Sequence, residues 1–375
     1  MPVTPPGHPV AEGTLTEEDL EMAAIPGPTE VERRIVFVAG SGRSGTSLMS
    51  GILKNLGLHV PEPEVSADQT NPKGFGEPQW VVDFHDTLLR RVNVHPGDGR
   101  PGAWFDAGRA GMFEPNRSEL TDWLRGQFEE ADSLVIKDPR ISWFLSLWRV
   151  AAVRAGATTS TITMLRPPAE VVGSKNTYYG GRLDDVSRLA GWTNVMLFTE
   201  RATRSSRRGF VRYHDLLSDW TSTVVRMGEE LELPEITNAE TAMMQEVHAF
   251  VDPQLRRVKH TWDDLSVPEN LRELAQGTWE QLNLLAEPGG DVPGVHGKLD
   301  ELRRAYGDLY AEAEALARSS VEAAGPVYVR DQEKARAEEA AAAYAAAGPV
   351  RKSYLRSRRV AGRIKRRLQH PAEDA

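Results

Sequence analysis

The chain has no cysteine among its 375 residues. This absence excludes disulfide bonds, thiolate zinc sites and cysteine nucleophiles. Apolar runs are also short, because no stretch approaches the ~18 uninterrupted apolar residues of a membrane-spanning helix. The N-terminus lacks the basic and then apolar order of a secretion signal. We therefore expect a cytoplasmic protein without disulfide bonds.

Basic residues are fewer than acidic ones, with 45 Lys and Arg against 54 Asp and Glu. Its formal net charge is −9, an unfavourable sign for nucleic-acid binding, so we expect no nucleic-acid partner. Basic residues are concentrated in one segment, since residues 351–368 hold nine Lys or Arg and no acid. Apolar positions within residues 350–368 share one helical face, as in an interfacial helix. We expect this tail to be either a solvated C-terminus or a peripheral contact with the inner face of a membrane.

Length and composition predict one α/β enzyme domain with extensions, because 375 residues with 40% hydrophobic content can bury a full core. Residues 1–30 are rich in Pro and acids and predict a flexible N-terminal arm. The domain is expected over residues 31–330, followed by an Ala-rich helix and the basic tail over residues 331–375. Residues 94–115 are rich in Gly and Pro, and so long an irregular stretch is either a surface insertion or a substrate lid.

The most informative segment is residues 36–48. An apolar strand enters a loop of glycines and hydroxyl residues, which passes directly into an amphipathic helix. Backbone N–H groups of such a loop and the positive end of the helix bind phosphate, and a purely structural turn is the alternative. Gly40 and Gly45 have the spacing of a P-loop, but Thr46 stands where a nucleotide triphosphatase needs Lys. The cation of this loop is Arg43.

A second anion site is predicted after residues 161–165, which have the pattern of another buried strand. Arg166 stands at the end of this strand, and the prolines after it suit the first positions of a helix. Ser174 lies about two turns into that helix, on the same side as Arg166. An arginine and a hydroxyl placed in this way could clamp a phosphate.

Four elements in this order resemble the family of sulfotransferases that use 3'-phosphoadenosine 5'-phosphosulfate. They are residues 43–46, the Lys-Asp-Pro-Arg segment 137–140 after an apolar strand, the pair Arg166 and Ser174, and residues 209–217. The loop resembles the bacterial, carbohydrate and tyrosylprotein branches, because cytosolic hormone and phenol sulfotransferases carry Lys where this chain has Arg43. The resemblance implies a three-layer, P-loop-like α/β fold with a central parallel sheet, to which the helical pattern after residue 217 adds C-terminal helices.

The resemblance also assigns residues that bind the donor. The 3'-phosphate would be held by Arg166 and Ser174, and Tyr213 would lie beside the adenine ring. The 5'-phosphosulfate would be held by the loop residues Gly42, Arg43, Ser44, Gly45, Thr46 and Ser47.

The implied reaction is in-line transfer of a sulfuryl group from this donor to a hydroxyl of a carbohydrate, glycolipid or other hydroxylated metabolite, and no metal is expected. Arg43 would stabilise charge on the leaving oxygen. Lys137 would neutralise the transferring group. A structural ion pair with Asp138 or another acid is the alternative role of Lys137.

The acceptor hydroxyl also needs a base, for which we predict Glu77. It ends the segment 71–77, which is similar to the Asn-Pro-Lys-Gly-aromatic-x-Glu stretch of many bacterial sulfotransferases. Partial burial would be needed to make such a carboxylate an effective base beside cations. His85 and His59 are the alternative bases.

Two other functional classes are compatible with a phosphate-binding α/β domain. One is a kinase or regulatory NTPase, for which Asp138 is the candidate metal-binding acid. The other is a sulfotransferase-like binding protein without turnover. Absence of the loop lysine disfavours the first class.

Overall fold

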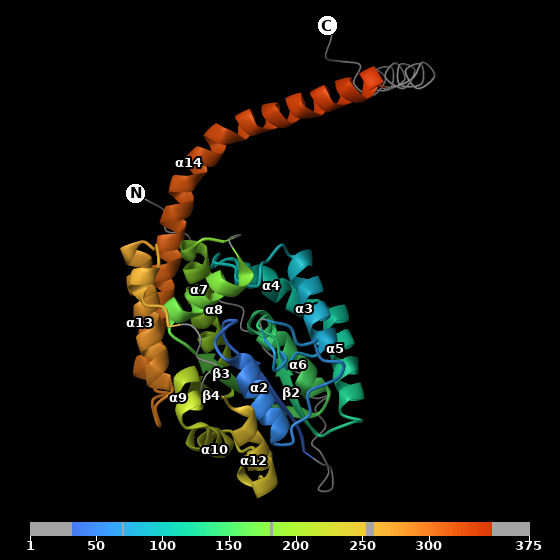
Figure 1. Cartoon of the computed structure of the whole chain (residues 1–375), viewed down its shortest axis with the longest axis vertical. Helices are drawn as coiled ribbons and strands as arrows, with labels where there is room; N and C mark the ends of the chain where they lie inside the picture. The colour runs from blue at the N-terminus through green and yellow to red at the C-terminus, as the bar shows by residue number, and fades with distance from the viewer. Residues whose placement is uncertain (1–31, 70, 181–182, 253–258, 347–375) are drawn as a thin grey trace. The chain divides into compact units, whose positions relative to one another are not determined.

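The computed structural model describes residues 32–69, 71–180, 183–252 and 259–346 (Figure 1). The predicted N-terminal arm (1–30) and basic tail (350–368) lie outside the described residues. The chain divides into two compact units, residues 1–310 and 311–375. The described part of the second unit is the continuation of helix α14, whose bounds are Pro293–Ala346. The sheet and the candidate site belong to the first unit.

Four parallel strands form the centre of the first unit in the order β2-β1-β3-β4. They are β1 (Arg33–Ala39), β2 (Ser133–Lys137), β3 (Ala157–Leu165) and β4 (Arg207–Arg212). In the register, Val38 pairs with Lys137 on one side and with Ile162 on the other. Because all strands are parallel, their carboxyl ends meet at one edge of the sheet. The predicted central parallel sheet is confirmed.

Helices cover both faces of this sheet, as the labels in Figure 1 show. Side chains alternate between the faces along β1, so Ile35 and Phe37 pack on one helical layer and Val36 and Val38 on the other. The first layer contains α3 (Gln79–Arg91), α4 (Ala103–Met112), α5 (Glu114–Gln127), η1 (Ile141–Phe144) and α6 (Leu145–Arg154). The second contains α2 (Thr46–Asn55), α9 (Tyr213–Ser218), α10 (Trp220–Glu230), α11 (Pro234–Thr237) and α12 (Thr241–Phe250). The predicted three-layer α/β fold is therefore confirmed.

A third hydrophobic cluster joins β3 and β4 to the remaining helices. These are α7 (Pro168–Tyr179), α8 (Asp185–Thr203), η3 (Trp262–Asp264), α13 (Glu269–Leu285) and the start of α14. Leu299 and Tyr306 of α14 are buried in this cluster, which confirms the added C-terminal helices. Among the described residues, no helix combines the length and apolar character that crossing a membrane requires.

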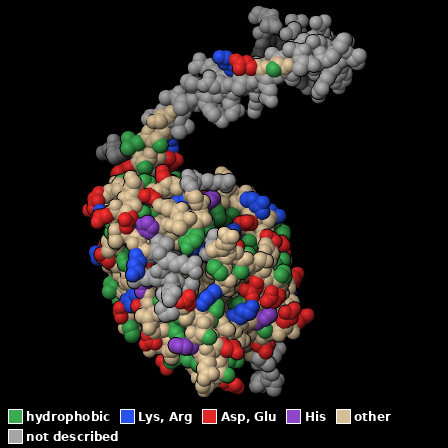
Figure 2. All heavy atoms as spheres, in the orientation of Figure 1, with side chains coloured by type: hydrophobic (Ala, Val, Ile, Leu, Met, Phe, Trp, Pro, Cys, Tyr) green, Lys and Arg blue, Asp and Glu red, His purple; other side chains and the backbone are tan. Residues whose placement is uncertain are grey.

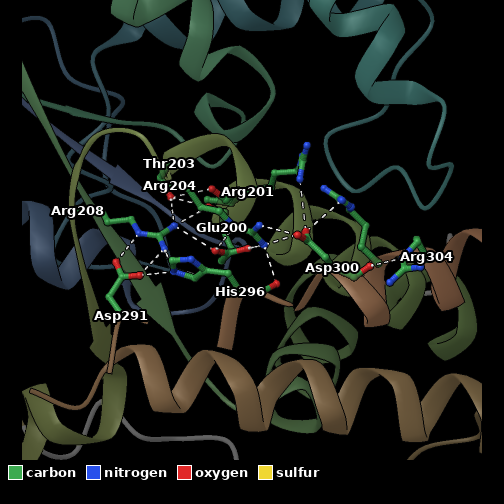
Figure 3. Close-up of polar contacts among 11 residues, drawn as sticks. Glu200, Arg201, Thr203, Arg204, Arg208, Asp291, His296, Asp300 and Arg304 are labelled. Atoms are coloured by element: carbon green, nitrogen blue, oxygen red, sulfur yellow. Dashed lines mark hydrogen bonds and ion pairs between the residues drawn. The ribbon is translucent and has the colours of Figure 1, made fainter. Parts of the chain in front are cut away.

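Charged side chains also fasten α14 to α8 and β4. Figure 3 shows Glu200 of α8 between the guanidinium groups of Arg204 and Arg208. The Glu200 oxygens accept hydrogen bonds from Arg204 at 2.7 Å and from Arg208 at 3.2 Å. Arg204 also donates a hydrogen bond to Asp300 of α14, and Arg208 donates one to Asp291 just before α14, each at 2.8 Å. We call this group the Glu200 cluster; its members are Glu200, Arg204, Arg208, Asp291, His296 and Asp300.

The expectation of a long irregular stretch over residues 94–115 is wrong in part. Residues 103–112 form helix α4, and its Ala103, Ala107 and Ala110 side chains are buried in the core. These small side chains recur at helical spacing and allow close packing, which the Gly and Pro content of the segment had obscured. The ring of Trp104 stacks on that of Trp143, with 4.2 Å between centroids. A role of residues 94–115 as a substrate lid stays a prediction.

Candidate active site

A pocket of about 530 Å³ opens at the carboxyl edge of the sheet. It is bounded by the loop between β1 and α2, by segment 71–77, and by residues at or just after the ends of β2, β3 and β4. Most residues predicted to act together line it: Gly42, Arg43, Gly45, Thr46, Ser47, Glu77, Lys137, Arg166, Ser174 and Tyr213. Ser44 is fully buried and does not line the pocket.

The loop before α2 is shaped by positive φ angles that suit glycine. Gly45 has φ 93° and caps α2, and a Cβ added there would lie 2.3 Å from the ring of Tyr213. No side chain caps the α2 N-terminus, and its first turn holds no acid. Its backbone N–H groups and the positive end of the helix dipole are thus available to an anion.

Arg43 and Arg166 meet on the α7 side of this loop. Arg43 Nε donates a hydrogen bond to Ser174 Oγ at 3.1 Å, and its guanidinium lies 4.2 Å from the centre of the Tyr178 ring. Arg166 donates to Glu170 at 2.9 Å and to the Arg43 carbonyl oxygen at 3.0 Å. Arg166 therefore supports the loop backbone as well as lining the pocket. The two predicted anion sites are parts of one pocket, in which Arg43 touches Ser174.

Lys137 and Glu77 meet beside Ser47, a second loop residue. The Lys137 ammonium group donates to the Glu77 carboxylate and, at 3.1 Å, to Ser47 Oγ. Lys137 is 2% exposed and Glu77 8% exposed. Burial raises the pKa of the Glu77 carboxyl, although the charge of Lys137 opposes this shift. The burial that an effective carboxylate base needs is present, and the ion-pair partner of Lys137 is Glu77 rather than Asp138.

His85, one alternative base, lies in the core and not at the pocket. Its Nε2 accepts a hydrogen bond from Trp148 Nε1–H at 2.8 Å, so its proton is on Nδ1 and is donated to Asp138 at 2.8 Å. Both ring nitrogens of this fully buried side chain are therefore occupied. His59 forms a backbone bridge with Leu134 and does not line the pocket either. The two alternatives to Glu77 are thus corrected by the structure.

The carboxylate of Asp138 is also engaged by hydrogen bonds within the chain. Its carboxylate accepts from His85 and, at 2.8 Å, from the Arg140 guanidinium. Burial acts to raise the pKa of Asp138, but the His85 hydrogen bond and the charge of Arg140 hold it below its ordinary value. No group of three His, Asp or Glu side chains able to hold a metal ion occurs among the described residues.

The structure adds pocket residues that the sequence analysis missed. Lys175 and Arg188 extend the cationic wall of α7 and α8, and His95 and Phe250 line other parts of the pocket. Lys175 directly follows Ser174, so a search for cations beside the predicted phosphate hydroxyl would have found it. His95 belongs to the segment 94–115 that was singled out as a possible lid, whereas Arg188 and Phe250 lie outside the recognised motifs.

The wall that contains His95 is held in place by distant side chains. Asn194 Nδ2 of α8 donates to the carbonyl oxygens of Asp98 at 2.8 Å and Arg100 at 3.1 Å. The Tyr306 hydroxyl of α14 donates to the Gly99 carbonyl oxygen at 2.5 Å. The pocket wall therefore depends on helices far along the chain.

The charge of the pocket is opposite in sign to that of the chain. Its described lining contains two acids, Glu77 and Asp252, and seven cations: Arg43, Lys73, Lys137, Arg140, Arg166, Lys175 and Arg188. On the face of the first unit shown in Figure 2, acidic and basic side chains are interspersed instead. A cationic pocket with exposed helix N–H groups fits a ligand with several negative charges.

No protein-family model and no curated protein matches the chain. Solved structures do. The sulfotransferase domain of the Synechococcus PCC 7002 olefin synthase is 16% identical with TM-score 0.40, over 69% of this chain and 98% of that domain. The sulfotransferase domain of the curacin biosynthetic pathway is 19% identical with TM-score 0.37, over 68% and 99%. A sulfotransferase from Mycobacterium tuberculosis is 16% identical with TM-score 0.35, over 68% and 78%. All three are described as a sulfotransferase or a sulfotransferase domain.

Proposed function

We propose that the chain transfers a sulfuryl group from 3'-phosphoadenosine 5'-phosphosulfate to a hydroxyl of a carbohydrate, glycolipid or other hydroxylated metabolite. One observation carries this proposal. A buried cation, Lys137, and a buried carboxylate, Glu77, meet beside Ser47 of the phosphate loop, inside a pocket whose charged lining is mainly cationic. These are the groups that transfer between two oxygens requires.

The donor would be held from two sides of the loop. On the α7 side, Arg43, Arg166 and Ser174 offer charged and hydroxyl donors to a phosphate. On the β2 side, Lys137 and Ser47 offer donors to a second anionic group. Two clusters of donors separated by one loop suit a nucleotide that carries two anionic groups.

The reaction would exchange one sulfur–oxygen bond for another. The acceptor oxygen would form a bond to sulfur as the bond from sulfur to the 5'-phosphate oxygen breaks, and that phosphate oxygen would keep the electron pair. Glu77 would accept the proton of the acceptor hydroxyl, a role favoured by its raised pKa. Lys137 and the N–H groups of the α2 N-terminus would stabilise the developing negative charge.

A kinase or NTPase is a weaker candidate on this geometry. Its candidate metal-binding acid, Asp138, is fully buried and held by His85 and Arg140. Calorimetric titration with adenosine 3',5'-bisphosphate, ATP and GTP tests the difference. We expect the bisphosphate to bind most tightly, and a preference for ATP or GTP would favour the kinase.

The decisive experiment is turnover of donor labelled in its sulfuryl group, with a cell extract as the source of acceptors. Glu77→Gln should lower the rate about 10²- to 10⁴-fold, the contribution of a positioned base. The wild-type rate should fall as pH drops through the Glu77 pKa, and the residual rate of the variant should lose that dependence. Glu64→Gln, which removes the charge of a Glu paired with Lys54 on the surface, is the matched control. Equal rates for wild type and Glu77→Gln would remove Glu77 as the base, and absence of any turnover would favour a binding protein.

A further inference from the structure

Lys175 is a pocket cation that none of the recognised motifs includes. It follows Ser174 on α7, is half-buried, and donates a hydrogen bond from Nζ to Ser41 Oγ of the phosphate loop at 3.0 Å. Within the described part of the chain, no carboxylate lies within ion-pair distance of this amine. A sequestered ammonium group without a counter-ion is costly unless a ligand supplies the negative charge.

The elements packed against α7 bring charges of both signs, and Asp185 of α8 accepts a hydrogen bond from Asn176, the residue after Lys175, at 2.7 Å. These elements are α8, α13 and η3. Arg188 of α8 lines the pocket and acts on Lys175 through its charge. His260 packs on Gly173, the residue before Ser174, and its Nδ1 lies 3.8 Å from Asp264. No charged side chain of α13 lines the pocket.

The remaining charged groups near Lys175 lie on α7 and on the loop. Glu170 of α7 is bound by Arg166 and by His214. Arg43 of the loop contacts Ser174. The one acid of α7 is therefore committed to other partners, and the loop adds a further cation.

Burial and the charge of Arg188 lower the pKa of Lys175 to about 8. The amine therefore loses its proton in a mildly alkaline solution when the pocket holds no anion. A phosphate group against the amine would raise this pKa again, because an opposite charge favours the protonated form. Phosphate itself releases its second proton near pH 6, so it is already a dianion under these conditions.

We propose that Lys175 binds a phosphate group of the nucleotide and takes up a proton from solution as it does so. The identity of the nucleotide rests on the function proposed above. Below about pH 7 the amine is already charged, so binding changes its protonation little. As pH rises above 8, each bound nucleotide must bring one proton, and affinity falls by up to about tenfold per pH unit.

Calorimetric titration of the full chain with adenosine 3',5'-bisphosphate tests this inference. Titrations at about pH 8.5 in two buffers of different ionisation enthalpy report the number of protons taken up, and we expect most of one proton per nucleotide for the wild type. Lys175→Met should abolish this uptake and weaken binding about 10- to 150-fold, the size of a lost charge-assisted contact. Lys175→Arg should keep the affinity within a few fold but abolish the uptake, because arginine does not titrate in this range.

Thermal unfolding separates a binding role from a structural one. Lys175→Met removes an ammonium group that lacks an acid, so its unfolding temperature without ligand should equal or exceed that of the wild type. Lys298→Met removes a lysine exposed on α14 and should change neither affinity nor proton uptake. A second titration with adenosine 5'-phosphate identifies the phosphate: persistence of the uptake assigns the 5' group, and its loss assigns the 3' group.

Two results would overturn the inference in distinguishable ways. If Lys175→Met binds the bisphosphate with wild-type affinity and proton uptake, Lys175 is not a phosphate contact, while the proposed function stands. If the wild type does not bind the bisphosphate at all, the proposed function fails and the role of Lys175 fails with it.

Discussion

The Glu200 cluster and the pocket both bury several charged side chains, but they satisfy them differently. In the Glu200 cluster each arginine meets acids on two sides, as Figure 3 shows. In the pocket, Arg43 and Lys175 meet hydroxyl groups and, among the described residues, no acid. Charges matched within the chain hold its elements together, whereas charges left unmatched at a cavity are free to bind a ligand.

This contrast predicts opposite consequences for the removal of one charge. In the Glu200 cluster, loss of a charge should lower stability and leave nucleotide binding intact. At an unmatched pocket charge such as Lys175, it should lower binding more than stability, whereas at the matched Lys137–Glu77 pair it should lower both turnover and stability. The three predictions below test the contrast, from the largest expected effect to the smallest.

Glu200→Gln should have the largest effect on folding. The variant leaves Arg204 and Arg208 beside an uncharged amide in a fully buried place. Breaking a buried ion pair on one side costs about 3–5 kcal/mol. Urea unfolding of the full chain measures this loss. Glu301→Gln, which removes an exposed acid paired with Lys298 on α14, should leave the midpoint unchanged.

The folded fraction of Glu200→Gln should bind adenosine 3',5'-bisphosphate with the affinity of the wild type. A large loss of affinity with little loss of stability would contradict the assignment of this cluster to structure.

Lys137→Met should lower turnover about 10²- to 10³-fold, the range for loss of a group that stabilises developing charge. The single variant also leaves Glu77 buried without its cation, which destabilises the fold. The double variant Lys137→Met, Glu77→Gln removes both charges and should recover most of that stability without recovering turnover. Lys54→Met, at an exposed Lys–Glu pair, is the control for turnover. Recovery of activity in the double variant would rule out catalytic roles for both residues.

Asp291 at the edge of the Glu200 cluster should have the smallest effect. Its hydrogen bond from Arg208 lowers the pKa of Asp291 to about 2, from an ordinary value of 3.8. Its contribution to stability is therefore present above pH 3.8 and is lost as pH falls through about 2. Because Asp291 is 41% exposed, we expect less than about 1 kcal/mol. Unfolding temperatures of wild type and Asp291→Asn should converge towards about pH 2, and a constant difference would contradict the pairing.

The elements best predicted from sequence are those encoded locally. The strand and loop of residues 36–48, and the strand that ends at Arg166, each contain their whole signal in one short segment. The family resemblance that these segments carry implied the parallel sheet, whereas the structure was needed to show that the two predicted anion sites are parts of one pocket. A local pattern cannot indicate that Glu77 pairs with Lys137, 60 positions away, or that Trp148 donates a hydrogen bond to His85.

Burial was the other quantity that sequence could not supply. The pKa of Glu77 rises because neighbouring elements cover it, and that of Lys175 falls for the same reason. Helix α4 was missed because its alanines pack against a core formed by distant residues. Interactions that depend on chain segments meeting from afar thus decide both the chemistry and the remaining structure.

The single hydroxyl of Tyr306 has a practical consequence for anyone who shortens this protein. This hydroxyl donates a hydrogen bond to the carbonyl oxygen of Gly99 and lies 3.1 Å from the carbonyl oxygen of Ala190. One side chain near the end of the first unit therefore holds two backbone segments together. A recombinant fragment that ends after the last of the four motifs would keep every proposed catalytic side chain. It would still lose the contacts of Tyr306 with these two segments. Expression boundaries should therefore be drawn beyond Tyr306, and a truncation that ends before it would be expected to loosen the pocket wall that contains His95.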